Sequence, residues 1–200
     1  VGPVLGGAPL NAVFQAHQIG LHLGGKAVMV SRIGQDELGK SLFKKIKEHG
    51  MNHTFIQQDP NADTGTVSIT LNGTEPEYEI TKNVAWDKLE WNESLSDLAN
   101  RCNAVCFGTL GQRAEPAKST IQKFIQTATK ANRLFDVNLR QNYFSKDTLD
   151  TCFQLSSIVK MNEEELPIVY KILGLTNDKS PILQIIDHYN LDLFVLTQGK

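Results

Sequence analysis

Residues 134–160 read LFDVNLRQNYFSKDTLDTCFQLSSIVK, and this stretch decides the fold class. Two short runs with apolar centres, residues 134–137 and 157–160, flank a segment with helical amphipathic spacing at residues 146–155. A buried strand, a helix and a second buried strand form a crossover unit, which joins parallel neighbours in one sheet. The stretch therefore predicts an α/β fold built on a parallel sheet.

The same alternation extends to both sides of this unit. Further strands are predicted at residues 27–30, 104–107 and 193–196. Further helices are predicted at residues 11–23, 38–49, 116–129, 163–173 and 181–188. Short apolar runs alternating with amphipathic helices are typical of a mainly parallel central sheet with helices on both faces. Ligands bind such folds beyond the carboxyl ends of the strands, so functional residues are expected directly after each apolar run.

A different pattern occupies residues 66–80. Val67, Ile69 and Leu71 alternate with hydroxyl-bearing residues, and the alternation resumes after Asn72-Gly73. Asn-Gly between alternating segments favours a hairpin turn, because both residues tolerate positive φ. The pattern predicts a small antiparallel hairpin with one apolar face and one hydroxyl-bearing face.

Composition narrows the classes of function. The chain has 200 residues, 40% of them hydrophobic, and a net charge of −2, so it can bury a core and has no basic excess for nucleic acid. Cys102, Cys106 and Cys152 are an odd number in a chain of this size, which indicates a reducing compartment and predicts a cytoplasmic protein. Cys102 and Cys106 are expected to pack in the core beside a buried strand. No apolar run approaches the length of a membrane span, so no membrane partner is expected.

Both ends of the chain are expected to be cuts through a longer protein. The sequence opens on Val1-Gly2-Pro3 without an initiator methionine. It closes on Lys200, four residues after a predicted strand.

The first candidate site is the segment from Gly6-Gly7 to Asn11. Two glycines allow the backbone to approach a ligand closely, and a helix beginning at Asn11 would offer free backbone amides. Sugar hydroxyls or an anion could bind there. The alternative is a glycine turn before a helix capped by Asn11, and spacing alone favours this structural role. The segment matches neither the dinucleotide fingerprint nor the Walker loop.

Asn162 and Glu165 form a second candidate, because they have the spacing of a capping box. Capping explains this spacing by itself. A Glu165→Gln change is expected to keep the cap, so it would separate capping from a role at a metal ion. His49 and His53 are also four residues apart, but Gly50 interrupts the helix that would place them on one face, so no metal site is expected there.

Seven segments together point to one family. In chain order they are residues 6–11, 31–39, 64–66, 107–113, 136–143, 162–165 and 197–199. This ordered set resembles the motifs of the pfkB, or ribokinase-like, carbohydrate kinases, and the segments at 107–113 and 136–143 are most similar to those of fructokinases. The resemblance covers nearly the whole chain, and the set is far more specific than any single motif.

The resemblance implies a fold and a reaction. Residues 1–200 would belong to one partial ribokinase-like domain, with a lid inserted at about residues 54–82 that closes over the sugar and can form a homodimer. The expected reaction transfers the γ-phosphoryl group of ATP, with Mg²⁺, to a primary hydroxyl of a small sugar. The similarity to fructokinases makes fructose the expected substrate and a fructose phosphate the expected product. The family's catalytic carboxylate lies in a Gly-Ala-Gly-Asp motif, which is expected beyond Lys200, so no catalytic base is assigned within this chain.

The family's binding roles can be placed on matching residues. The resemblance assigns five residues to the sugar or the transferring phosphate: Gly6, Gly7, Asn11, Arg113 and Arg140. It assigns four residues to the bound nucleotide: Asn162, Glu165, Thr197 and Gly199. Glu165 would also organise Mg²⁺ indirectly, through water. For Asp136, a structural hydrogen bond is the expected role.

Several alternatives stay open. The segment at 136–140 is also compatible with a kinase for 2-keto-3-deoxygluconate or ribose. A catalytically silent sugar-binding relative is a second alternative. A dinucleotide-dependent dehydrogenase is disfavoured by the missing fingerprint and by the hairpin.

Overall fold

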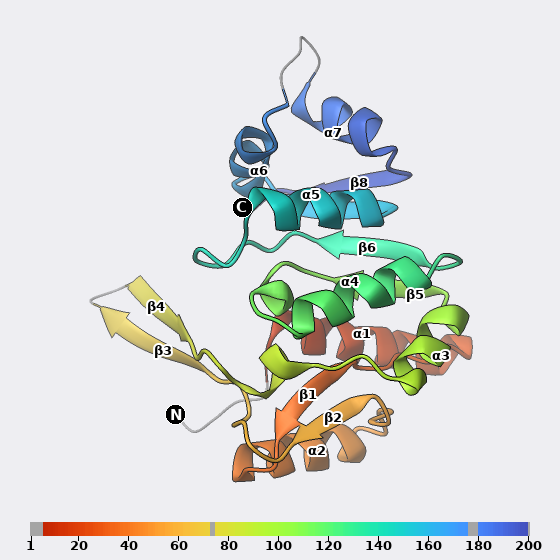
Figure 1. Ribbon diagram of the computed structural model, residues 1–200, viewed down its shortest axis with the longest axis vertical. Coiled ribbons are helices and arrows are strands. Elements are labelled where there is room, and N and C mark those ends of the chain that lie inside the picture. Colours follow the sequence, from red (N-terminus) through yellow and green to blue (C-terminus); the bar gives the residue numbers. More distant parts are fainter. Residues whose placement is uncertain (1–5, 73–74, 176–179, 200) are drawn as a thin grey trace. The chain divides into compact units, whose positions relative to one another are not determined.

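The computed structural model describes residues 6–72, 75–175 and 180–199, without the side chains of residues 69–78 (Figure 1). The chain divides into two compact units, Val1–Leu89 and Glu90–Lys200, called here the N-terminal unit and the C-terminal unit. The prediction of a single domain over residues 1–200 stays a prediction. Within the described ranges, every helix is too short or too polar to cross a membrane.

The N-terminal unit contains two small sheets. Its elements are α1 (Ala8–Leu23), β1 (Ser31–Gly34), α2 (Glu37–Glu48), β2 (Ile56–Asp59), β3 (Val67–Asn72), β4 (Glu75–Ile80) and the 3₁₀ helix η1 (Ala85–Lys88). Strands β1 and β2 pair in parallel, whereas β3 and β4 form the predicted antiparallel hairpin, with Val67 opposite Ile80. The turn at Gly73 lies outside the described residues, as do the side chains of Ile69 and Leu71. One hydrophobic core cluster of this unit is formed by Leu10, Ile33, Ile46, Met51 and Ile56.

The C-terminal unit is built on a four-stranded parallel sheet. Its elements are α3 (Glu93–Arg101), β5 (Ala104–Phe107), the 3₁₀ helix η2 (Leu110–Gln112), α4 (Ala117–Thr127), β6 (Asn132–Asp136), α5 (Lys146–Leu155), β7 (Ile158–Asn162), α6 (Glu165–Leu173), α7 (Pro181–Tyr189) and β8 (Leu193–Thr197). The strands follow the order β5-β6-β7-β8, and every neighbouring pair is parallel. The crossover unit predicted from residues 134–160 is therefore confirmed, as β6, α5 and β7.

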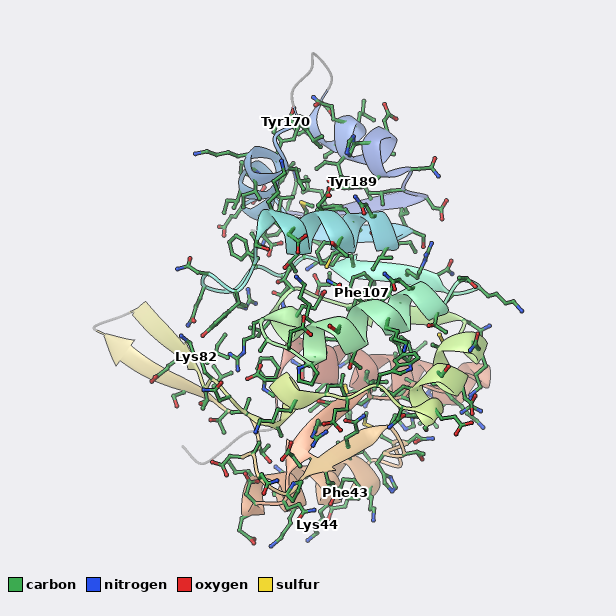
Figure 2. All side chains as sticks on the ribbon, in the orientation of Figure 1. Phe43, Lys44, Lys82, Phe107, Tyr170 and Tyr189 are labelled. Atoms are coloured by element: carbon green, nitrogen blue, oxygen red, sulfur yellow. The ribbon has the colours of Figure 1, made fainter. Side chains whose placement is uncertain are left out.

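Aromatic side chains fill the core between this sheet and helices α4–α7. Phe135 stacks on Phe107 at 5.4 Å between ring centroids and meets Phe153 edge-on at 5.3 Å. Phe153 in turn stacks on Tyr189 at 5.0 Å. Figure 2 labels two residues of this core, Phe107 at the end of β5 and Tyr189 at the end of α7. The core side chains of β6 and β7 come from alternate positions, as a strand's period of two requires.

Local sequence explains where most helices begin and end. The side chains of Asp36, Asn92, Ser145 and Ser180 each accept a hydrogen bond from a backbone amide three residues later, so four helices have a polar N-cap. Gly174 ends α6 in the left-handed conformation, with φ of 72°, which is common for a glycine C-cap.

Two boundary predictions in the N-terminal unit are wrong. Residues 27–30 contribute only an isolated bridge between Val28 and Asn52, and the strand begins at Ser31. An apolar run marks burial but not register, and Ile33, outside the predicted run, is the residue that enters the core. Helix α1 begins at Ala8, because Gly7 is its N-cap and Pro9 suits its first turn.

Helix α3 was not predicted from the sequence. Its nine residues carry a polar N-cap at Asn92 and bury Leu95, Leu98 and Ala99. The remaining helices and strands of the C-terminal unit agree with the predicted ranges to within two residues at each end.

Candidate functional site

The carboxyl ends of β5, β6, β7 and β8 lie at one edge of the C-terminal sheet, called here the carboxyl edge. Strand pairing brings Asp136 opposite Lys160 and Asn162 opposite Thr197, so the ends of three strands lie next to one another. The segments that follow the four strands carry the predicted site residues Arg113, Arg140, Asn162, Glu165, Thr197 and Gly199. The structure therefore brings all six to the same edge of one unit.

Two loops of this edge are joined around Arg113. The Arg113 guanidinium lies 5.0 Å from the centre of the Tyr143 ring, and the Tyr143 amide donates to the Arg140 carbonyl at 3.1 Å. The Thr109 hydroxyl, which is buried, donates to the Val137 carbonyl at 3.1 Å. These contacts fix the segment after β5 against the segment after β6.

The two candidate arginines have different surroundings. Arg113 is partly buried, whereas Arg140 is exposed. Within the described part of the chain, the only hydrogen bond of the Arg140 side chain is to the carbonyl of the preceding Leu139, at 2.9 Å. An exposed guanidinium on an ordered loop can bind a phosphate or carboxylate in bidentate fashion. Arg140 is therefore the better placed of the two for direct contact with an anionic group.

A buried polar network supports the loop after β5. Gln112 is 3% exposed, and its side-chain amide donates to the Gly108 carbonyl at 2.9 Å and to the Cys152 sulfur at 3.1 Å. Burial raises the pKa of the Cys152 thiol to about 12, so this cysteine stays protonated and has a structural role. Cys106 was expected in the core, but it is exposed, because the neighbouring Phe107 takes the inward position on β5.

The Glu165 side chain connects two segments of the carboxyl edge. It is 6% exposed, and its two carboxylate oxygens accept one backbone amide each, from Leu139 at 2.8 Å and from Asn162 at 2.9 Å. The Glu165 amide donates in return to the Asn162 side chain at 2.7 Å. The reciprocal pair predicted from the capping-box spacing is thus present, and it spans the turn between β7 and α6.

The bond from Leu139 changes the meaning of a substitution at Glu165. Sequence spacing predicted that Glu165→Gln would keep the cap intact. Both oxygens in fact accept from N–H donors, so a glutamine would point its own N–H₂ group at one of them. The structure therefore predicts that glutamine is not fully tolerated here, because Glu165 joins two loops in addition to bonding the turn that precedes α6.

The same geometry limits how a divalent cation could bind. Within residues 6–72, 75–175 and 180–199, no group of three or more His, Cys, Asp or Glu side chains is arranged to hold a metal ion. Asp136 forms an ion pair with Lys160 at 3.0 Å, in agreement with the structural role expected for it. Glu165 keeps lone pairs that can accept from water, which fits Mg²⁺, an ion that retains several waters.

Thr197 and Gly199 end the row of loops. The Thr197 hydroxyl donates to the Met161 carbonyl at 3.4 Å, and the Thr197 carbonyl accepts from the Glu163 amide at 3.1 Å. Both Thr197 and Gly199 are exposed. Their position at the carboxyl edge suits contact with a ligand, and their nucleotide role stays a prediction.

Gly6, Gly7 and Asn11 belong to the N-terminal unit. Gly7 is the N-cap of α1 with φ of 107°, a conformation that favours glycine, and an added Cβ on Gly6 or Gly7 would meet open space. Asn11 is not the cap, because it lies in the first turn beyond Pro9 and its amide donates to the Gly7 carbonyl at 3.0 Å. The exposed Asn11 side chain is free of the capping role that spacing favoured.

Sequence reasoning missed a hydrogen-bond cluster in the N-terminal unit. The Asp36 carboxylate accepts from the Gly39 amide, the Thr64 amide and the Thr64 hydroxyl, each at 2.7 Å. The Thr64 hydroxyl in turn accepts from the Gly34 amide at 3.0 Å. The sequence shows the helix cap, since Asp36 lies three residues before Gly39, but nothing local marks a partner 28 residues away.

Two carboxylates of the N-terminal unit, those of Asp36 and Asp59, are held in their charged form. Burial alone would raise the pKa of Asp36, but the amides of Thr64 and Gly39 and the Thr64 hydroxyl outweigh it, so the pKa lies below the ordinary 3.8. The Asn61 amide, with the Arg32 guanidinium at 2.8 Å, likewise lowers the pKa of the buried Asp59 despite its desolvation. Both side chains are therefore anions throughout the neutral range.

Comparison with known proteins places this geometry in a family. A family model for pfkB family carbohydrate kinases matches residues 2–200. A fructokinase of Solanum tuberosum is 27% identical over 199 residues, which are 98% of this chain and 59% of that protein. The chain spans about half the length of the first curated relatives that it matches, 53% and 51%.

Solved structures agree with this match. A fructokinase of Vibrio cholerae O395, crystallised with fructose, ADP and calcium ion, is 25% identical, with a TM-score of 0.74 over 97% of this chain and 63% of its own. A sugar kinase of Pyrococcus horikoshii in complex with ATP is 25% identical, with a TM-score of 0.73 over 85% of this chain and 57% of its own. The predicted ribokinase-like α/β fold class is confirmed by these neighbours.

Proposed function

We propose that this chain, which belongs to the pfkB family of carbohydrate kinases, serves the ATP-dependent phosphorylation of a small sugar at a primary hydroxyl, with fructose as the substrate. The observation that carries the proposal is the row of four loops at the carboxyl edge. It combines an exposed arginine, a second arginine stacked on Tyr143 and a buried carboxylate that joins two of the loops.

The carboxyl edge suits phosphoryl transfer, which depends mainly on positioning and charge stabilisation. Arg140 would bind the transferring phosphate or the substrate, and Arg113 would support it from the neighbouring loop. Glu165 would keep the Arg140 loop in place through the Leu139 amide, at 2.8 Å. Asn162, Thr197 and Gly199 would border the nucleotide.

Mg²⁺ would neutralise charge on the nucleotide phosphates, and Glu165 would meet it through water. The residues at the edge fit an indirect role, because the Glu165 oxygens already accept two backbone amides. Gly6, Gly7 and Asn11 would contact sugar hydroxyls. The base that accepts the sugar proton would be the aspartate of the family's Gly-Ala-Gly-Asp motif, and no residue of the described chain is proposed for that role.

Two comparisons favour fructose among the sugars. The relative from Solanum tuberosum is named a fructokinase, and the structure from Vibrio cholerae contains fructose with ADP. A kinase for 2-keto-3-deoxygluconate or ribose is the alternative within the same family. Cytoplasmic location, a single domain over residues 1–200 and a homodimer through the lid at about residues 54–82 complete the proposal.

The test is ADP release by the full-length protein with Mg²⁺ and ATP. The panel contains fructose, ribose, 2-keto-3-deoxygluconate, glucose and adenosine. Turnover selective for fructose is expected, and selectivity for another sugar would reassign the substrate while keeping the reaction. A folded protein that binds a sugar without turnover would contradict the kinase proposal and support a silent binding relative.

A matched pair of variants tests the site within this assay. Arg140→Ala is expected to lower kcat/KM for the sugar about tenfold to a hundredfold, as the loss of a charged hydrogen bond predicts. Arg101→Ala removes an exposed arginine at the end of α3 and should leave kcat/KM unchanged. Equal effects of the two changes would contradict the role given to Arg140.

A further inference from the structure

The β3–β4 hairpin is attached to the rest of the N-terminal unit through two roots. In Figure 1 its strands extend away from β1, β2 and α2. The outgoing root, residues 63–66, leads into β3, and the return root, residues 81–85, leaves β4. How the hairpin is oriented within this unit therefore depends on what holds these two short segments.

The two roots are held by different forces. The return root is anchored by its last two residues, since Val84 is 2% exposed and Ala85 0%, and the Ala85 amide donates to the Asp63 carbonyl at 2.8 Å. The outgoing root is held by the charged group of Asp36, to which Thr64 donates through both its amide and its hydroxyl at 2.7 Å. Hydrogen bonds to an ionised acceptor are short and about twice as strong as neutral ones.

The space around the outgoing root allows little movement. A Cβ on Gly34 would lie 2.6 Å from the Ala62 carbonyl oxygen and 2.7 Å from the Thr64 nitrogen. A Cβ on Gly39 would lie 2.8 Å from the Thr64 hydroxyl, and one on Gly65 would overlap the Trp86 indole. Gly34 and Gly39 therefore let the root lie directly against the turn between β1 and α2, and Gly65 lets it lie against Trp86 of η1.

We propose that Asp36 is a positioning residue, whose carboxylate fixes the outgoing root of the β3–β4 hairpin to the turn between β1 and α2. Asp36 does this while it caps α2 through Gly39, so one side chain sets both the start of that helix and the direction of the hairpin. Nothing in this proposal requires a bound sugar. A second step, that the fixed hairpin helps to bind the sugar, rests on the proposed function.

The alternative is that Asp36 only caps α2, and Asp36→Asn separates the two roles. Asparagine is as good an N-cap as aspartate, so the cap to Gly39 can remain. Its amide group would then face the Thr64 amide, where the second carboxylate oxygen now accepts, so two donors would oppose each other. The hairpin root should therefore loosen while α2 stays formed.

The experiment is hydrogen–deuterium exchange on the full-length protein without any ligand. Asp36→Asn is expected to speed exchange at residues 64–68 about tenfold or more, as the loss of a charged hydrogen bond predicts, with little change in α2. Thr64→Val removes the hydroxyl and should act in the same direction. Thr64→Ser keeps the hydroxyl and should stay close to the wild type, as the matched control.

Two results would overturn the proposal. One is wild-type exchange at residues 64–68 in folded Asp36→Asn and Thr64→Val variants. The other is an equal acceleration of α2 and the hairpin root, which would reduce Asp36 to a helix cap. If Asp36→Asn does not fold, the proposal is tested by comparing exchange at residues 64–68 in Thr64→Val and Thr64→Ser. Equal exchange in these two variants would then overturn it.

Sugar kinetics test the second step separately. If the hairpin covers the sugar, Asp36→Asn should raise the sugar KM about tenfold with a smaller change in kcat. Faster exchange at the root with an unchanged KM would keep Asp36 as a positioning residue and reject the step that depends on the proposed function. Because the exchange experiment needs no turnover, failure of either idea can be recognised independently.

Discussion

Asp36 in the N-terminal unit and Glu165 in the C-terminal unit are carboxylates with the same task in different surroundings. Each caps or begins a helix, and each also accepts an amide from a loop more than 25 residues away, Thr64 for Asp36 and Leu139 for Glu165. Glu165 is 6% exposed and begins α6, a helix packed on the core of the C-terminal sheet, whereas Asp36 is only partly buried and holds the root of the β3–β4 hairpin.

The burial of each carboxylate decides whether its removal destabilises a whole unit or increases the mobility of one segment. Removing Glu165 leaves two backbone amides without an acceptor beside a packed core, so the free energy of unfolding decreases. Removing Asp36 leaves amides without an acceptor at the base of the β3–β4 hairpin, so local movement can relieve much of the loss of stability. We therefore expect Glu165 variants to unfold the C-terminal unit more readily and Asp36 variants mainly to loosen the hairpin.

Glu165→Ala should have the largest effect. It leaves the amides of Leu139 and Asn162 without their acceptor, and we expect the free energy of unfolding to fall by about 3 kcal/mol. Urea denaturation measures this change. Glu164→Ala, which removes the exposed neighbouring carboxylate, is the control and should cost less than about 0.5 kcal/mol. Equal stability of the two variants would show that Glu165 does not join the loops.

Gly39→Ala should have the next largest effect, in the N-terminal unit. A Cβ at this position overlaps the Gly34 backbone carbonyl, which cannot move aside without disturbing β1. We expect a loss of about 2 kcal/mol in the free energy of unfolding, measured by urea denaturation. Gly6→Ala is the matched control, because its Cβ meets nothing within 4 Å. A neutral Gly39→Ala would mean that the turn is looser than the contacts indicate.

Glu165→Gln sharpens the comparison further. One of its two oxygens becomes an N–H₂ group that faces an amide donor, so we expect a loss of about 1–2 kcal/mol on the same urea scale. Sequence spacing alone predicted tolerance. A loss below about 0.5 kcal/mol would restore the capping-only interpretation of Glu165, since surface changes of that size are ordinary.

Acid should weaken the N-terminal unit through Asp36 and Asp59. Both pKa values lie below the ordinary 3.8, so the stabilisation is complete above that value and is lost as the pH falls through the lower, folded-state pKa values. Hydrogen exchange of β1 and β2 between about pH 7 and pH 3 measures this loss, with unfolded-chain rates as reference. The dependence should be shallower in Asp36→Asn, and an identical profile would contradict the contribution of Asp36.

Arg113→Lys should have the smallest effect on stability. A lysine ammonium can still lie over the Tyr143 ring, although without the planar stacking of guanidinium, so about 0.5 kcal/mol should be lost. Thermal unfolding measures the change, and Tyr143→Phe, which keeps the ring, is the control. A loss as large as that of Glu165→Gln would show that Arg113 supports the carboxyl edge as strongly as Glu165.

The sequence predicts the parts of this structure that are encoded locally. Alternation of apolar runs and amphipathic helices predicted all four strands of the C-terminal sheet, and the spacing of Asn162 and Glu165 predicted their reciprocal hydrogen bonds. The ordered motifs predicted which residues share the carboxyl edge. These signals work because period, cap and turn chemistry depend on neighbours within a few residues.

The parts that the sequence did not predict depend on distant partners. The bond from Leu139 to Glu165 spans 26 residues, and the bonds from Thr64 to Asp36 span 28. No sequence feature near Leu139 or Thr64 indicates that its amide has a distant acceptor, since the donors are ordinary backbone amides. The shift of the first strand from residues 27–30 to Ser31–Gly34 has the same origin, because its register is set by pairing with β2.

The spatial order β5-β6-β7-β8 repeats the order of these strands along the chain. Strands β6, β7 and β8 therefore each leave the ribosome after the neighbour with which they pair, and no strand has to wait for a later one to enter between two neighbours. Pairing each strand with its predecessor keeps the sequence separation of paired strands smaller than an interleaved order would, and it allows growth from one end. The C-terminal unit can thus assemble stepwise during translation, and until a following strand arrives its growing edge is the surface most exposed to chaperones and to unwanted strand pairing.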